Sequence, residues 1–229
     1  MDPGLYIAAS GMLAEQVRQS QLANDLSNAS TAGYKPDQAE QQSFGALLLS
    51  NTSTGQQIGT INTGVRIDRV VTDTSPAALN QTGQPLDFGI SGTGYFAVRT
   101  AQGIRYTRDG QFESNASNQL TDSQGNLVLG QNGQPVTVSA KGTVPATALG
   151  VFNVPNPAKQ GDNLFTGAST GRAAGVVRQG ELEASGVDPV RTMTDMIASL
   201  RAYQAGQSAI QSIDQTMQEN AQSVGSLGG

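Results

Sequence analysis

The chain has 229 residues, only 14 % of them charged, with 18 acidic and 13 basic side chains and a net charge of −5. This balance provides no positive surface for nucleic acid or for an anionic membrane. The sequence contains no histidine and no cysteine, which excludes imidazole acid–base chemistry, cysteine nucleophiles, disulfides and His/Cys metal sites. We therefore expect neither a metal nor a cofactor.

The first thirty residues have no basic cluster and no apolar run of seven, so they do not fit a Sec-type signal peptide. No stretch approaches the roughly 20 apolar residues of a membrane span. The absence of cysteine suits both the cytosol and an exported chain. Composition alone therefore leaves the compartment open.

A helix is expected from Leu5 to Ala29, because only Gly11 interrupts it and the apolar residues recur with a helical period. Those apolar residues are Leu5, Ala9, Met12, Leu13, Ala23 and Leu26. Turn-forming residues from Ser30 to Gly33 end the helix. From 35 to 63, an apolar patch and a run rich in Ser, Thr and Gln predict an extended or partly ordered linker.

Between 64 and 180 the pattern changes to short β-type runs separated by turn signals. The expected strands are Val65–Val71, Phe88–Ile90, Tyr95–Arg99, Ile104–Thr107, Leu120–Thr121, Leu127–Leu129, Pro135–Val138 and Leu149–Val154. The middle of the chain is therefore predicted to be an all-β domain that folds independently.

From Asp188 to Val224 the helical period returns, with Asp188 as N-cap and Pro189 in the first turn. Positions three and four apart form a coiled-coil-like seam: Met193, Met196, Leu200, Tyr203, Gln207, Ile210, Asp214, Met217, Ala221 and Val224, with Ile197 and Ile213 alongside. Gly206 and the polar seam positions weaken this helix. Because helices are stabilised mainly by burying an apolar face, each end helix needs the other or a neighbouring molecule.

These elements predict an α+β fold in which the two end helices form a discontinuous, coiled-coil-like helical domain. The expected parts are an N-terminal helix in 1–34, a linker in 35–63, the β domain in 64–180 and a C-terminal helix in 181–229. The residues expected to carry oligomerisation are Leu5, Met12, Leu13, Leu26, Met193, Met196, Ile197, Leu200, Tyr203, Ile210 and Met217.

Two motifs suggest other chemistry. Residues Gly92–Ala97 fit the G-x-G-x-x-A spelling of a dinucleotide loop, but a β-type segment follows, so no helix N-terminus receives a pyrophosphate. Asp109, Glu113 and Asp122 offer a carboxylate pair for hydrolysis. The sequences Asp109–Gly110 and Asp122–Asn126 are nevertheless ordinary turns.

Several segments resemble the axial proteins of the bacterial flagellar rod and hook, and most closely the rod members of the FlgG/FlgF type. The N-terminal segment Ala23–Lys35 (ANDLSNASTAGYK) resembles that family's signature through Ala23, Asn24, Leu26, Asn28, Thr31, Gly33 and Tyr34. Further similar strings are LDFGISGTGYF from Leu86, YTRDGQF from Tyr106, GELE from Gly180 and TDMI with the following RAY from Thr194.

The resemblance implies that the end helices form an antiparallel pair in an inner tube and that many copies stack helically into a drive shaft. It implies neighbouring rod and hook proteins as partners, and export through the flagellar type III apparatus with an uncleaved N-terminal signal. The weak isolated helices suit this route, since segments that order only on docking do not polymerise early. The alternatives are an extracellular β-domain adhesin that forms a small oligomer through its end helices and, third, a carboxylate-pair enzyme.

Overall fold

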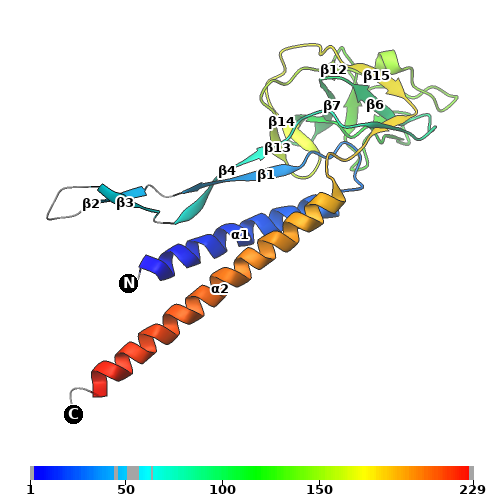
Figure 1. Ribbon diagram of the computed structural model, residues 1–229. Helices are drawn as coiled ribbons and strands as arrows, with labels where there is room; N and C mark the ends of the chain where they lie inside the picture. Colours follow the sequence, from blue (N-terminus) through cyan, green and yellow to red (C-terminus); the bar gives the residue numbers. More distant parts are fainter. Residues whose placement is uncertain (1–2, 44–45, 51–56, 63, 227–229) are drawn as a thin grey trace. The chain divides into compact units, whose positions relative to one another are not determined.

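The computed structural model describes residues 3–43, 46–50, 57–62 and 64–226 (Figure 1). Its contacts divide the chain into two compact units. Unit 1 comprises Met1–Leu26, Asp37–Val71 and Pro189–Gly229, and unit 2 comprises Ser27–Pro36 and Thr72–Asp188. Helices at both ends and many strands between them confirm the α+β class.

The two helices of unit 1 are α1 (Pro3–Ser27) and α2 (Pro189–Ser226), and they run antiparallel. Glu15 of α1 meets Ser199 of α2, whereas the earlier residue Met12 meets the later residue Gly206. Helix α2 begins directly after Asp188, with Pro189 in its first turn as predicted. Neither helix in the described part of the chain has the apolar length needed to cross a membrane.

The remainder of unit 1 is built from paired strands (Figure 1). Strand β1 (Asp37–Ser43) pairs with β4 (Val65–Thr72), and β2 (Ala46–Ser50) pairs antiparallel with β3 (Gln57–Asn62). Much of the predicted linker is thus ordered as strands, while its residues 44–45, 51–56 and 63 lie outside the described residues. The side chains of β1 are mostly polar, so the pattern of hydrophobic residues does not predict this strand.

Unit 2 contains the other strands: β5 (Leu79–Gln81), β6 (Phe88–Ser91), β7 (Tyr95–Thr100), β8 (Gly103–Thr107), β9 (Glu113–Ser114), β10 (Leu120–Thr121), β11 (Leu127–Leu129), β12 (Val151–Phe152), β13 (Ala158–Gln160), β14 (Leu164–Thr166), β15 (Val176–Gln179) and β16 (Glu181–Glu183). A 3₁₀ turn occupies Ala146–Ala148. The main sheet has the order β13-β14-β8-β7-β11-β10-β9, with β12 also pairing with β7. Two further pairs are β15 with β6 and β16 with β5.

Strand β7 is buried on both faces because its side chains alternate between two apolar clusters. Phe96 and Val98 belong to the larger cluster, where Phe96 meets Phe112 edge-on at 5.3 Å between ring centroids. Tyr95 and Ala97 belong to the smaller one. The near-continuous apolar run of β7 therefore reflects a central strand.

One predicted strand is absent and the limits of the β region differ from those expected. Residues Pro135–Val138 make only isolated bridges, since Pro135 has no N–H to donate to a ladder. Unit 2 also takes in Tyr34 and Glu183, both fully buried and both outside the predicted range 64–180. Strand β4, up to Val71, groups with the helices instead.

Candidate functional site

The contact between α1 and α2 is made through small residues. Thr192, Ser199 and Gly206 recur every seven residues along one face of α2. A Cβ added at Gly206 would lie 2.8 Å from Cγ of Met12, so the missing side chain permits close approach of the two helices. The sequence signalled only the helix-weakening effect of this glycine.

Polar contacts connect α1 to both of its neighbours in unit 1. The Ser199 hydroxyl donates to the Glu15 carboxylate at 2.6 Å, and the Gln41 amide of β1 donates to the other Glu15 oxygen at 3.3 Å. The backbone N–H of Val65, at the start of β4, donates to the Ser10 hydroxyl at 3.3 Å. Glu15 therefore lies where α1, α2 and β1 meet, a role that sequence pattern did not reveal.

The part of unit 1 whose side-chain burial is described has almost no apolar core. Within residues 4–26, 37–43, 64–71 and 189–222, whose side-chain burial is described, Ala14 is the single buried apolar side chain. The other buried side chains in these ranges are Asp25, Thr192 and Ser199. Unit 2, by contrast, buries two apolar clusters. The helix pair therefore lacks the buried apolar face that normally stabilises helices.

Most of the large exposed apolar side chains on the two helices form two stripes. On α2 they are Val190, Met193, Ile197 and Leu200, spaced three and four apart, so they share one face. We call this the open α2 stripe. The open α1 stripe consists of Tyr6, Leu13 and Val17, with Leu13 63 % exposed.

The predicted oligomerisation residues thus fall on different faces. Met193, Ile197, Leu200, Met217 and Leu13 are exposed, whereas Leu5, Met12, Leu26, Met196, Tyr203 and Ile210 are half-buried. The single seam expected from the sequence is therefore divided between two faces of α2. One face is the half-buried line, which consists of Met196, Tyr203 and Ile210, and the other is the open α2 stripe. On both faces the apolar residues recur three or four apart, so the sequence period alone cannot tell one face from the other.

The C-terminal part of α2 extends beyond the N-terminal end of α1 (Figure 1). Gly206 lies near the backbone oxygen of Ala8, and only about one and a half turns of α1 precede Ala8. Helix α2 nevertheless continues to Ser226. Its last turns therefore extend beyond the reach of α1.

The signature segment begins on α1 and ends inside unit 2. Ala23 and Asn24 are exposed, while Leu26, Asn28 and Thr31 are half-buried, and the Thr31 hydroxyl lies 3.1 Å from the Asn28 side-chain oxygen. Gly33 has φ +65°, and a Cβ there would overlap the backbone of Arg108. Tyr34 is fully buried, with the Lys159 ammonium 4.0 Å from its ring centroid.

Three charged side chains meet beside this segment. The Lys35 ammonium lies 2.6 Å from one oxygen of Glu183, and the Arg108 guanidinium lies 2.9 Å from the other. Glu183 and Lys35 are 0 % exposed and Arg108 is 2 % exposed. Arg108 also lies over the Tyr95 ring, and burial raises the pKa of the Tyr95 phenol against the opposing charge of Arg108. Each of the three charges stands in a motif that carried the family resemblance.

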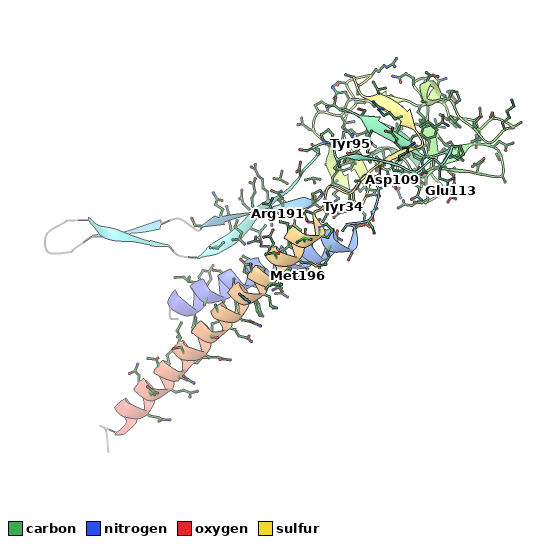
Figure 2. All side chains as sticks on the ribbon, turned by 45° about the vertical axis from the view of Figure 1, so that its right-hand side comes forward. Tyr34, Tyr95, Asp109, Glu113, Arg191 and Met196 are labelled. Atoms are coloured by element: carbon green, nitrogen blue, oxygen red, sulfur yellow. The ribbon has the colours of Figure 1, made fainter. Side chains whose placement is uncertain are left out.

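The alternative sites have structural explanations. Gly92 and Gly94 have positive φ values in the turn between β6 and β7, a backbone conformation that favours glycine, so a tight turn explains both residues. Asp109 accepts from the N–H of Gln111, and Asp122 accepts from the N–H groups of Gln124 and Asn126. Figure 2 shows Tyr95, Asp109 and Glu113 within unit 2, where Glu113 is exposed.

Three family models match separate parts of the chain. The one described as "Flagella basal body rod protein" matches residues 5–35, and "Flagellar hook protein FlgE/F/G D1 domain" matches residues 89–151. The one described as "Flagellar basal body rod FlgEFG protein C-terminal" matches residues 178–223. The matches therefore include the signature segment, the central strands and most of α2.

Similar proteins extend over nearly the whole chain. The flagellar hook-basal body complex protein FlhO of Bacillus subtilis is 30 % identical over 98 % of this chain and 99 % of its own length. The flagellar basal-body rod protein FlgG of Agrobacterium fabrum is 32 % identical over 92 % of this chain and 95 % of its own. FlgF of Caulobacter vibrioides is 31 % identical over 100 % and 99 %. With such identity along both full lengths, this chain belongs to the family of flagellar basal-body rod proteins.

Proposed function

We propose that this chain, a structural rod subunit, polymerises helically through its end helices into the basal-body rod, which transmits motor torque to the hook. The observation that carries the proposal is that α1 and α2 bury only one apolar side chain among their described residues while exposing two apolar stripes. The family and the names of its relatives support the rod as the setting.

The driving force for this assembly is burial of the open stripes. Complete burial of a Leu, Ile, Val or Met side chain contributes about 1.5–3 kcal/mol. The open α2 stripe carries four such side chains, and within its own chain they remain largely in solvent. Packing of α1 and α2 against neighbouring copies would bury these side chains and supply an apolar core to the part of unit 1 whose side chains are described.

The proposed partners are copies of this chain, neighbouring rod and hook proteins, and the flagellar type III export apparatus. The chain would cross the envelope unfolded, with residues 1–30 as an export signal that is not cleaved, and would end in the periplasmic rod. The proposal includes no catalysis, no cofactor, no nucleic acid and no membrane insertion. The relatives give the adhesin alternative no support.

The test replaces Leu200, which is 46 % exposed, or Ile197, which is 54 % exposed, by Asp. Ala202→Asp is the matched control, because it adds the same charge at an exposed site two residues from Leu200 and five from Ile197, on another face of α2. We expect Leu200→Asp and Ile197→Asp to abolish rod assembly and motility in cells lacking the native subunit. The melting temperature of unit 2 should not change, and Ala202→Asp should assemble.

Normal assembly of both stripe variants would contradict the proposal. Ile210→Asp is a separate test of the half-buried line, and it should also block assembly without lowering the melting temperature of unit 2. A large loss of melting temperature in any of these variants would mean that α2 belongs to the core of unit 2.

A further inference from the structure

Lys35, Arg108 and Glu183 come from three distant parts of the chain and meet in unit 2. Lys35 and Glu183 are 148 residues apart, and Arg108 and Glu183 are 75 apart. Lys35 is the last residue of the signature segment, Arg108 follows β8, and Glu183 ends β16. The three charges therefore connect both ends of unit 2 to its central sheet.

The partners of these charges leave little freedom of position. Beyond the carboxylate, the Lys35 ammonium donates to the backbone oxygen of Ser75 at 2.6 Å and Arg108 donates to that of Gly92 at 2.9 Å. The Glu183 carboxylate also accepts the N–H of Ala77 at 2.8 Å. Glu183 is the anion shared by two buried cations, so its loss would leave both without their ion-pair partner.

Backbone pairing surrounds the same point. The N–H of Gly33 donates to the oxygen of Glu183 at 2.8 Å, and the N–H of Gly186 donates to the oxygen of Tyr34 at 2.9 Å. The Ser185 hydroxyl donates to the oxygen of Asn28 at 2.9 Å. The two segments that lead out of unit 2 toward α1 and α2 thus lie side by side.

We propose that the Lys35–Glu183–Arg108 triad is a latch that fastens these two exit segments, 28–36 and 183–186, to each other and to the β sheet. None of the three residues belongs to either apolar cluster. Release of the triad should therefore free the exit segments while the clusters hold the sheet together. This inference goes beyond rod assembly and does not depend on it, because it concerns the isolated monomer.

The test measures amide hydrogen exchange in the full-length monomer of three variants. Glu183→Gln removes the shared anion, and Lys35→Met removes one cation while leaving the Arg108–Glu183 pair. Glu181→Gln is the matched control, because it makes the same change two residues away in β16, where Glu181 forms a 3.8 Å pair with the exposed Arg178. The exchange rates of the Gly33 and Gly186 amides report on the latch. Those of Leu120 and Val136 report on the sheet, since the N–H of Leu120 donates to the oxygen of Val136 and that of Val136 donates to the oxygen of Val128.

In Glu183→Gln we expect exchange at Gly33 and Gly186 to be faster by about tenfold or more, with a smaller change at Leu120 and Val136. Lys35→Met should act in the same direction more weakly, and Glu181→Gln should match the unmodified chain. Equal acceleration at all four amides, or unfolding of both Glu183→Gln and Lys35→Met, would place the triad in the common core and overturn the proposal. Unchanged rates at Gly33 and Gly186 would also overturn it.

Discussion

Gly33 and Gly11 differ in their tolerance for a side chain. Gly33 has φ +65° and no room for a Cβ, whereas Gly11 lies in regular α1 with no atom within 4 Å of an added Cβ. Gly33→Ala should destabilise unit 2 by about 2 kcal/mol or more, and Gly11→Ala should favour the helix by up to about 1 kcal/mol. Urea unfolding followed by tyrosine fluorescence for the first, and helical circular dichroism for the second, measure these effects. Equal stability of Gly33→Ala and the unmodified chain would contradict the tight contact with Arg108.

The carboxyl group of Asp109 should make the unfolding free energy of unit 2 depend on pH. Burial raises the pKa of its carboxyl above the ordinary value near 3.8, although hydrogen bonds from Gln111 and Asn163 oppose the shift. A raised folded pKa means that the carboxyl's contribution to stability is complete below the unfolded pKa and is lost as pH rises through the folded pKa. Relative to Asp109→Asn, the unmodified chain should therefore lose unfolding free energy as pH rises above the ordinary carboxyl pKa near 3.8. Chemical denaturation across this range measures the difference, and a constant difference would show that Asp109 titrates normally.

At the level of single residues, sequence identified the turn role of Asp109 and the signature positions Gly33 and Tyr34, but not the triad. Arg108 and Lys35 were visible as members of motifs, and charged residues are scarce in this chain. That Lys35 would meet Glu183 across 148 residues depends on how the strands are arranged. No local pattern contains that information.

The two helices fit together through one close contact that a paired substitution can test. Gly206→Ala adds a Cβ 2.8 Å from Cγ of Met12, so it should weaken α1–α2 pairing despite the better helix propensity of alanine. Shortening the opposing side chain in Gly206→Ala/Met12→Ala should restore part of the loss. A double-mutant cycle on the thermal stability of the assembled subunits, in which the helices are ordered, measures the coupling. Purely additive effects would show that the two residues are not in contact.

Among the elements, the end helices and the strands around Tyr95–Thr107 were predictable because their hydrophobic periods are strong. Strands β1 and β13 were not, since their residues are mostly polar. Strand β1 pairs with the distant β4, whereas β13 pairs with β14 directly after it in the chain. The division of α2 into a half-buried line and the open α2 stripe was also hidden. Only the position of α1 distinguishes these faces.

For the whole molecule, the two units should differ in protection before assembly. Because unit 1 buries one apolar side chain in the ranges described above, residues 1–26 and 189–229 should exchange amide protons freely in the purified monomer. Residues 27–36 and 72–188 should be protected. Hydrogen exchange measured by mass spectrometry compares protection in these two sets of residues. Uniform protection along the chain would contradict assembly-dependent ordering of the helices.

The interleaving of the two units constrains any exchange of parts between relatives. The chain passes from one unit to the other after Leu26, Pro36, Val71 and Asp188. Consider a chimaera in which only residues 72–180 are moved into a relative. Arg108 would then be separated from Glu183, and the native Tyr34 would no longer pack against its own β sheet. Recombination that retains function must therefore move the segment ending in Lys35 and the return strand containing Glu183 as a single cassette with the sheet.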